Sequence, residues 1–291
     1  MKIGIYGRVY KGEHLVYLKQ LIAQLNKQKI EVYIYSGYQK QIQNSKTLLA
    51  LPSFSTHIEV KDFNLLLAVG GDGTILDTLS LIRDSEIPVA GINMGRLGFL
   101  ADIHKEEIEI LVKAIVQSSY TIEKRTLIYV ESNKNSFGEI NYGLNEFTIH
   151  KIDSASMIVI HVYLNGEFLN SFWADGLVIA TPTGSTAYSL SCGGPIIFPT
   201  ANSFVITPVA PHNLNARPMI IPDDTVLSFE VESRSASYLT ALDSRFHTLD
   251  NTYQIAVKKA PFTFNLIRLP ESTYLKTLRE KLRWGEDTRN S

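Results

Sequence analysis

The sequence predicts an α/β domain, with a parallel sheet flanked by helices, followed by an all-β sandwich domain. Through about residue 120, strand-like apolar runs alternate with helical stripes of apolar residues. From residue 121 the β-type segments are short and turn signals are frequent. A chain of 291 residues with 45% hydrophobic and 20% charged residues is long and apolar enough to build two globular cores.

The first part of the chain has the pattern of a parallel sheet. β-type runs occur at 2–6, 30–34, 65–69 and 87–93, and helical stripes at 15–25, 75–82 and 108–115. Strands that alternate with helices form parallel sheets with helices on the faces. Ligands of such sheets gather outside the carboxyl ends of the strands. The segments that follow residues 69 and 93 are therefore the places to look for a site.

The second part of the chain has the pattern of a sandwich. β-type segments occur at 127–130, 147–150, 157–164, 177–180, 205–209, 226–231, 238–242, 253–257 and 262–267. Asn165-Gly166 stands between two of them and predicts a tight hairpin turn. A leucine stripe predicts a final helix at 274–284 that returns to the first domain. We therefore expect one domain at 1–120, completed by 271–291, and a second at 121–270.

Composition excludes several functional classes. The net charge of −1 gives no overall attraction to nucleic acid or to a membrane surface. No apolar run approaches the roughly 20 residues that span a bilayer, and the first ten residues resemble a strand, not a secretory signal. Cys192 is the one cysteine, so no disulfide framework and no zinc-type cluster are expected. These features predict a cytoplasmic protein without nucleic-acid or membrane partners.

The apolar run at 65–69 ends in the glycine-rich stretch Gly70-Gly71-Asp72-Gly73-Thr74, after which the pattern turns helical. Glycine lets a ligand approach the backbone closely, and the free N–H groups at a helix start favour an anion. An acid such as Asp72 is unexpected beside an anion unless it handles a proton or a metal. The alternative is that Asp72 only caps the helix.

Two other glycine-rich stretches lie in the first part. Three glycines, Gly91, Gly95 and Gly98, lie at the end of the strand predicted at 87–93. Arg96 among them is a candidate phosphate contact, the alternative being a solvated loop residue. Residues 7–12 have the glycine spacing of a P-loop, but Glu13-His14 replaces the Lys-Ser/Thr pair that would hold phosphate and magnesium. A Walker-type site is therefore not expected.

The segment 175–195 is the richest in chemical groups. Seven hydroxyl-bearing residues lie between Thr181 and Ser191, beside glycines. Hydroxyls donate and accept hydrogen bonds, which suits ribose, amide and phosphate groups, and Tyr188 offers a flat face for an adenine or nicotinamide ring. The alternative is a loop whose hydroxyls cap helices. Asn145-Glu146, at a strand entry, suits a base edge or ribose hydroxyls, or is an ordinary strand start. Cys192 among small residues suits packing better than nucleophilic attack.

Together these stretches resemble the NAD kinase family, in the family's order and spacing over residues 2 to about 285. The stretches that carry the resemblance are Gly70–Thr74, 91–100, Asn145-Glu146, Asp175-Gly176-Leu177, 181–189, Gly193-Gly194-Pro195 and 208–212. Diacylglycerol and sphingosine kinases share the first motif, and phosphofructokinases have a close variant. The Thr181-Pro182-Thr183-Gly184-Ser185-Thr186-Ala187-Tyr188 block is much more specific.

The resemblance implies a site in the cleft between an α/β domain and a β-sandwich domain. It implies transfer of the γ-phosphoryl group of ATP to the 2′-hydroxyl of the adenosine ribose of NAD, with Asp72 as the proton acceptor. No second acid is an obvious metal ligand, so Mg²⁺ is expected to be held mainly by the nucleotide. The residues expected to bind substrates are Gly71, Asp72, Gly73, Asn145, Glu146, Asp175, Thr183, Thr186, Ala187, Tyr188, Ser189, Leu190, Ser191 and Ala210, with Arg96 and Arg245 as further candidates.

The family forms dimers and tetramers, in which the loop of Ala210 reaches a neighbouring subunit's site, so a homodimer or homotetramer is expected. The chain departs from the family's pattern at Trp173, where many bacterial relatives have Arg. Asp243-Ser244-Arg245 replaces a frequent Asp-Gly-Gln or Asp-Gly-Asn, and Ser156 replaces a residue that is often basic or His. These departures concern ligand contacts and regulation by NADP or NADPH, and the sequence leaves open NADH as acceptor and polyphosphate as donor.

Two other functions share parts of this pattern. A lipid kinase would have the Asp72 turn, but the chain shows no basic or amphipathic face for a membrane. A dinucleotide sensor would keep the pocket and do no chemistry, and the intact Asp72 argues against it.

Overall fold

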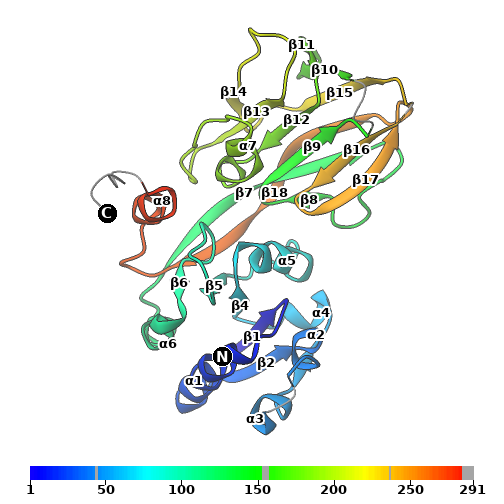
Figure 1. The fold of residues 1–291 in the computed structure, drawn as a ribbon. Helices are drawn as coiled ribbons and strands as arrows, with labels where there is room; N and C mark the ends of the chain where they lie inside the picture. Colours follow the sequence, from blue (N-terminus) through cyan, green and yellow to red (C-terminus); the bar gives the residue numbers. More distant parts are fainter. Residues whose placement is uncertain (43–44, 153–156, 236, 284–291) are drawn as a thin grey trace. The chain divides into compact units, whose positions relative to one another are not determined.

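The computed structural model describes residues 1–42, 45–152, 157–235 and 237–283. It divides into two compact units, Met1–Lys124 with Phe264–Ser291 (unit 1) and Arg125–Thr263 (unit 2). Two long strands, β7 (Thr121–Ser132) and β18 (Ile255–Arg268), carry the chain out of unit 1 and back into it (Figure 1). Unit 2 is therefore an insertion between the first 124 residues and the C-terminal segment of unit 1.

The sheet of unit 1 is parallel, as predicted. Its order is β18–β5–β4–β1–β2–β3, with β6 paired to β5, and all of these pairs are parallel. Its strands, besides β18, are β1 (Lys2–Gly7), β2 (Glu31–Tyr35), β3 (Ser53–Phe54), β4 (Leu65–Gly70), β5 (Val89–Asn93) and β6 (Ile103–His104). The buried strands read as nearly continuous apolar runs because both faces of a parallel sheet are covered.

Helices cover both faces of this sheet. On one face α1 (Leu15–Lys27) and α6 (Ile108–Gln117) pack side by side and share one apolar core with alternate strand residues such as Leu65 and Leu67. Helix α5 (Asp72–Ile82) lies on the other face, where a Cβ at Gly91 would come 2.3 Å from Ile75. Short helices α2 (Ser36–Gln39), α3 (Lys46–Leu49) and α4 (His57–Val60) and two 3-10 turns, η1 (Gly12–His14) and η2 (Lys105–Glu107), complete the connections.

The predicted C-terminal helix is α8 (Tyr274–Leu282), and it belongs to unit 1. Its Lys281 Nζ donates to the Leu97 carbonyl at 2.5 Å, and the rings of Tyr274 and Phe99 lie 6.5 Å apart. Helix α8 therefore packs against the loop that follows β5. Trp284 lies outside the described residues.

Unit 2 is a sandwich of antiparallel strands, as predicted. One sheet has the order β14–β13–β12–β9–β16–β17, and the other contains β11–β10–β15–β18. The remaining strands are β8 (Tyr142–Gly143), β9 (Glu146–His150), β10 (Ile158–Leu164), β11 (Glu167–Ala174), β12 (Gly176–Ala180), β13 (Ser203–Val209), β14 (Met219–Pro222), β15 (Leu227–Ser233), β16 (Ser237–Leu242) and β17 (Arg245–Asp250). A single apolar core takes side chains from both sheets, which is the packing of a β-sandwich.

The predicted hairpin joins β10 and β11. Asn165 and Gly166 have φ of 52° and 84°, and Leu164 pairs with Glu167 across them. Positive φ at both central residues is the geometry for which Asn-Gly is preferred. The segments predicted at 253–257 and 262–267 form one strand, β18. The edge strands β14 and β17 were not predicted, since exposed edges lack clear apolar alternation.

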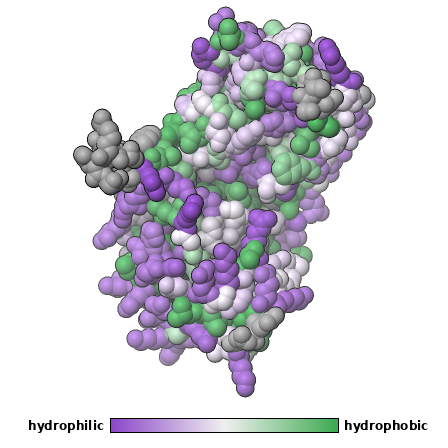
Figure 2. Space-filling view, in the orientation of Figure 1, coloured by the Kyte–Doolittle hydropathy of each residue, from purple (hydrophilic) through white to green (hydrophobic). Residues whose placement is uncertain are grey.

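Within the described ranges, no helix is long and apolar enough to cross a bilayer. Figure 2 shows hydrophobic residues in small groups among hydrophilic ones on the visible face.

Candidate functional site

The glycine-rich stretch after β4 forms the predicted strand, turn and helix. Helix α5 begins at Asp72, with Gly71 as its N-cap, and Gly71 and Gly73 are exposed. A Cβ at Gly70 would come 2.1 Å from Thr74 Oγ1, so the turn needs glycine there. The Asp72 side chain does not cap α5, so the capping alternative is wrong.

The Asp72 carboxylate binds the loop that follows β5. Oδ2 accepts from the Phe99 N–H at 2.9 Å, and Oδ1 accepts from the N–H groups of Leu100 and Ala101 at 3.0 and 2.9 Å. A Cβ at Gly98 would lie 1.9 Å from Oδ1, so only glycine admits this approach. A carboxylate has about four acceptor positions, and three are taken, which leaves one on Oδ2.

The loop after β5 is itself compact. Asn93 Nδ2 donates to the carbonyls of Arg96 and Ala101 at 2.5 and 3.1 Å, and its Oδ1 accepts from the Gly95 N–H at 2.7 Å. Gly70 pairs with Asn93 in the parallel ladder, so the turns after β4 and β5 meet at one sheet edge, as predicted. Arg96 is exposed at this loop.

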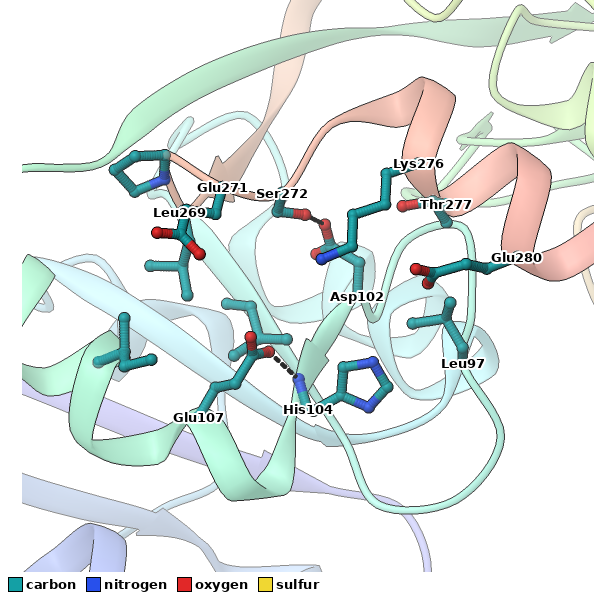
Figure 3. Close-up of a pocket in the computed structure, with 13 residues that line it drawn as sticks. Leu97, Asp102, His104, Glu107, Leu269, Glu271, Ser272, Lys276, Thr277 and Glu280 are labelled. Carbon is teal, nitrogen blue, oxygen red and sulfur yellow. Dashed lines mark hydrogen bonds between the residues drawn. The ribbon is translucent and has the colours of Figure 1, made fainter.

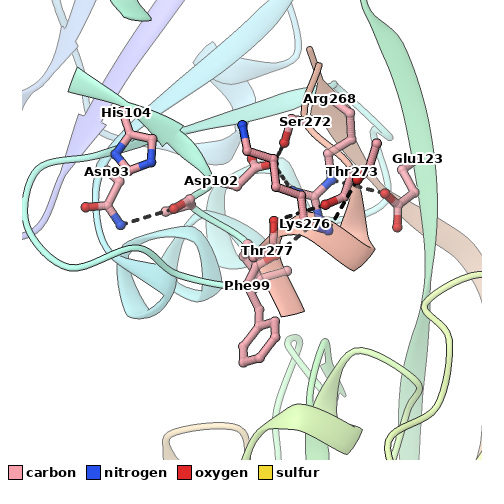
Figure 4. A network of polar contacts seen from close by, with 12 residues as sticks. Asn93, Phe99, Asp102, His104, Glu123, Arg268, Ser272, Thr273, Lys276 and Thr277 are labelled. Carbon is pink, nitrogen blue, oxygen red and sulfur yellow. Dashed lines mark hydrogen bonds and ion pairs between the residues drawn. The ribbon is translucent and has the colours of Figure 1, made fainter. Parts of the chain in front are cut away.

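A buried ionic network holds the same loop from its other side (Figure 4). Arg268 is 4% exposed. It contacts Asp102 Oδ2 at 2.5 Å, donates to Glu123 Oε2 at 3.0 Å, and donates to the Phe99 carbonyl at 3.1 Å. Ser272 Oγ donates to Asp102 Oδ2 as well. Sequence reasoning missed this network, whose signal was a charged residue, Arg268, at the end of an otherwise apolar run.

Arg8 is a candidate site residue that sequence reasoning also missed. Residues 7–12 were set aside together because they do not continue as a P-loop, and Arg8 was not considered by itself. Arg8 follows β1, and its Nε lies 3.6 Å from Asp77 Oδ2 on α5. Its Nη1 lies 3.8 Å from where a Cβ at Gly73 would stand. Tyr6 bonds to Asp77, and burial raises the pKa of both side chains. A guanidinium thus lies at the exposed start of α5, beside the glycine turn.

In unit 2, Asp243 holds Asn145-Glu146 in much the way that Asp72 holds its loop. Its carboxylate accepts from the N–H groups of Leu144 and Asn145 at 2.8 Å and of Glu146 at 3.2 Å. Arg245 donates to the carbonyls of Ile140 and Tyr142 at 2.5 Å each. The Asp-Ser-Arg departure is therefore built into the support of the Asn145-Glu146 segment.

Glu146 is a buried acid whose pKa is strongly raised. Burial and the nearby charge of Asp243 raise its pKa to about 8, while a hydrogen bond from the Tyr188 N–H acts in the opposite direction. Its Oε2 has no hydrogen-bond partner among the described residues. At neutral pH the Glu146 carboxyl is therefore mostly protonated, and it can donate a hydrogen bond as well as accept one.

Many hydroxyls of the loop at 181–191 bond within unit 2. Thr181 Oγ1 donates to the Leu144 carbonyl at 2.6 Å, Thr183 Oγ1 accepts from Arg125 at 3.1 Å, and Ser189 pairs with Thr207 at 2.8 Å. A Cβ at Gly184 would lie 2.1 Å from the Asn145 carbonyl. The loop thus packs against Asn145. Of the predicted ligand residues, Thr183 and Ser189 are buried, Thr186, Ala187 and Leu190 are half-buried, and Tyr188 and Ser191 are exposed.

Further predicted residues surround Tyr188. Its ring centroid lies 5.6 Å from that of His150, and Asp175 is near enough to act on the Tyr188 charge. Asp175 forms an ion pair with Lys151 at 2.6 Å. Burial raises the pKa of the Cys192 thiol, which disfavours the nucleophilic thiolate, so the packing interpretation holds.

Trp173, one of the departures from the family's pattern, and the loop of Ala210 also belong to unit 2. Trp173 is exposed on β11, and its carbonyl accepts from the His212 N–H at 2.8 Å. Ala210 is exposed with φ of 45°, a strained conformation for a residue with a Cβ. Ser156 lies outside the described residues. No group of three potential metal-ligating His, Cys, Asp or Glu side chains occurs in the described part of the chain.

These features define a two-domain protein with an acid-bearing glycine turn at a parallel sheet edge and a hydroxyl-rich loop on a β-sandwich. The chain belongs to the ATP-NAD kinase family. The model of the family's N-terminal domain matches residues 3–120, and that of its C-terminal domain matches residues 144–269.

Individual relatives agree with this assignment. The chain is 48% identical to an NAD kinase of Flavobacterium psychrophilum and 45% identical to one of Cytophaga hutchinsonii, in each case over the full length of both chains. The fold matches that of yeast NADH kinase in complex with NADH, with a TM-score of 0.87, 24% identity, and coverage of 100% of this chain and 90% of that one. It also matches an Archaeoglobus fulgidus NAD kinase in complex with ATP, with a TM-score of 0.76, 23% identity, and coverage of 97% and 99%.

Proposed function

We propose that this protein is an NAD kinase that transfers the γ-phosphoryl group of ATP to the 2′-hydroxyl of the adenosine ribose of NAD. The observation that carries the proposal is the Asp72 carboxylate, fixed by three N–H donors in an exposed glycine turn, in a chain of the ATP-NAD kinase family. The remaining acceptor position on Asp72 Oδ2 takes the hydroxyl proton.

Phosphoryl transfer requires positioning and charge neutralisation more than a strong base. The N–H groups at the start of α5 suit the phosphates of the donor, and the Arg8 guanidinium beside Gly73 supplies positive charge. Because bond making lags behind bond breaking in a loose transition state, the ribose hydroxyl keeps its proton until late. A carboxylate placed beside that hydroxyl is then a sufficient acceptor.

The Mg²⁺ ion enters as part of the MgATP substrate. It bridges phosphate oxygens and usually keeps several water ligands, with only one or two carboxylates from a protein.

Unit 2 supplies groups suited to the dinucleotide. Tyr188 presents an exposed ring for stacking, and the Asp175 carboxylate and the protonated Glu146 suit hydroxyl and amide groups. The other residues of the proposed NAD site are Asn145, Thr183, Thr186, Ala187, Ser189, Leu190 and Ser191. Cytoplasmic location is proposed because ATP and NAD are both drawn from that compartment.

A homo-oligomer, dimer or tetramer, is also proposed. Strand β14 is an edge strand of its sheet with Met219 and Ile220 exposed, and Leu214 and Ala210 are exposed just before it. An open edge with apolar side chains favours pairing with another chain. A second copy of this chain is the partner that family membership supports.

One assay separates this function from its alternatives. The purified protein is incubated with NAD and MgATP, and the product is analysed for a dinucleotide bearing a 2′-phosphate. In parallel assays, NADH replaces NAD as the acceptor, and polyphosphate replaces ATP as the donor. Turnover of diacylglycerol in vesicles without turnover of NAD would identify a lipid kinase instead, and NAD binding without any product would identify a sensor.

A further inference from the structure

Arg268, the last residue of β18, uses all three nitrogens of its buried guanidinium within unit 1 (Figure 4). Nη1 lies 2.5 Å from Asp102 Oδ2, Nε donates to Glu123 Oε2 at 3.0 Å, and Nη2 donates to the Phe99 carbonyl at 3.1 Å. The guanidinium is planar, and its donors have a fixed geometry. Three contacts of this kind fix its orientation as well as its position.

The peptide group between Phe99 and Leu100 joins Arg268 to Asp72. Its carbonyl accepts from Arg268, and its N–H, which belongs to Leu100, donates to Asp72 Oδ1 at 3.0 Å. A charged donor at one end of a peptide group polarises it and strengthens the hydrogen bond at the other end. A single peptide group therefore stands between the buried guanidinium and the Asp72 carboxylate.

Asp102 gives Arg268 a second attachment to the same loop. It directly follows Ala101, whose N–H donates to Asp72 Oδ1 at 2.9 Å. The Asp102 carboxylate contacts Arg268 and accepts from Ser272 Oγ at the wall of a cavity of about 160 Å³ (Figure 3). The two N–H groups that hold Asp72 Oδ1 therefore both adjoin groups that Arg268 contacts.

We propose that Arg268 is a positioning residue for phosphoryl transfer and acts on Asp72 through the Phe99–Leu100 peptide group. It keeps two N–H groups on Oδ1, so the open acceptor position stays on Oδ2. In the transfer step the ribose oxygen bonds to the γ-phosphorus, the bond to the ADP oxygen breaks, and the hydroxyl proton passes to Oδ2. This role rests on the proposed function, whereas the hold of Arg268 on the loop does not.

Arg268→Lys keeps the positive charge but loses the rigid fork, so one ammonium group has to serve three separate acceptors. We expect kcat to fall by about 10- to 100-fold because Asp72 is misplaced, and KM for ATP and for NAD to stay within a factor of about two. Glu123→Gln is the matched control, since it removes a charge from the network and leaves the bond to Phe99. It should lower Tm and keep kcat. Equal losses of kcat in the two variants would overturn the proposal.

A double variant separates an effect through Asp72 from a general effect on the fold. In an Asp72→Asn background the group that Arg268 positions is already gone. Arg268→Lys should then lower the remaining kcat by no more than about twofold. The same fold loss as in the wild-type background would mean that Arg268 acts independently of Asp72.

Hydrogen–deuterium exchange measures the hold on the loop without any substrate. The amides of Leu100 and Ala101 should exchange at least about tenfold faster in Arg268→Lys than in the wild type, while those of α1 keep their rate and show that unit 1 is folded. Glu123→Gln should leave all of them unchanged. Wild-type exchange of Leu100 and Ala101 in Arg268→Lys contradicts the positioning role.

Ser272→Ala is a milder variant for the case that Arg268→Lys does not fold. It removes only the hydroxyl bond to Asp102 and should accelerate exchange of Leu100 and Ala101 to a smaller extent. Unchanged exchange of these amides counts against the proposal here too. If exchange is accelerated as expected but the wild type forms no phosphorylated dinucleotide, only the proposed function fails.

Discussion

At the scale of single residues, Asp72 holds the loop after β5, and its proposed role as proton acceptor can be tested by substitution. In Asp72→Asn an amide nitrogen replaces an oxygen that accepts backbone N–H groups of the loop. The side-chain NH₂ group then faces a backbone N–H group, and neither can accept from the other. We expect kcat to fall by about 10²- to 10⁴-fold and stability to fall by about 1–3 kcal/mol. NAD affinity should change little, as measured by calorimetry beside the kinase assay.

Gly98→Ala is the control for the loop. It keeps the Asp72 carboxylate but places a methyl group 1.9 Å from Oδ1, so the loop and the carboxylate must move apart while the acid itself remains. If Asp72 is the proton acceptor, Asp72→Asn loses far more turnover than Gly98→Ala at a similar loss of Tm. Near-normal turnover of Asp72→Asn would exclude that role.

Glu146 gives the protein a pH-dependent stability. Its pKa rises from an ordinary 4.5 to about 8 on folding, so the folded state binds more protons than the unfolded state between these values. Its contribution to the free energy of unfolding is fully present below pH 4.5 and is lost as the pH rises through 8. By pH 7 the free energy of unfolding has fallen by about 3 kcal/mol from this source. Glu146→Gln should flatten this slope in denaturant titrations between pH 5 and 8.5. A slope equal to that of the wild type would show that Glu146 is not the group responsible.

At the scale of elements, β1 and α5 together present Arg8 at the glycine turn. Arg8→Gln should raise KM for ATP by about tenfold or more, since a charge-assisted phosphate bond is lost, while KM for NAD stays within a factor of about two. Initial rates at varied ATP measure this. Lys19→Gln, an exposed charge change on α1, should leave both constants unchanged. Equal effects of the two variants would mean that Arg8 does not contact the donor.

The local elements were predictable because their signals are local. The apolar run, the glycines and the helical stripe around Asp72 lie within 20 residues, and both Asn165-Gly166 and the alternation of 158–164 specify their strands directly. By contrast, the hydrogen bond between Asp72 and Phe99 joins residues 27 positions apart, and that between Ser272 and Asp102 joins residues 170 positions apart. No periodicity encodes such pairs. Likewise, the hydroxyls of the loop at 181–191 indicated a binding surface, and folding of the loop itself employs several of them.

At the scale of the whole molecule, the open edge of β14 predicts self-association. Ile220→Lys places a charge on this exposed edge, and we expect a shift to smaller species in analytical ultracentrifugation. Phe246→Lys on β17, the opposite edge strand of the same sheet, is the matched control and should keep the wild-type mass. If both variants sediment like the wild type, β14 is not the contact.

The order in which the chain is synthesised follows from the insertion of unit 2 into unit 1. When residues 1–124 have been made, β5 still lacks its neighbour β18, and Asp102 and Glu123 lack their cationic partner. Arg268 emerges only after all of Arg125–Thr263 has been made. A nascent chain can therefore fold its sandwich while the loop beside Asp72 is still held on one side only. The ionic support of this loop therefore forms only after the whole of unit 2 has been made.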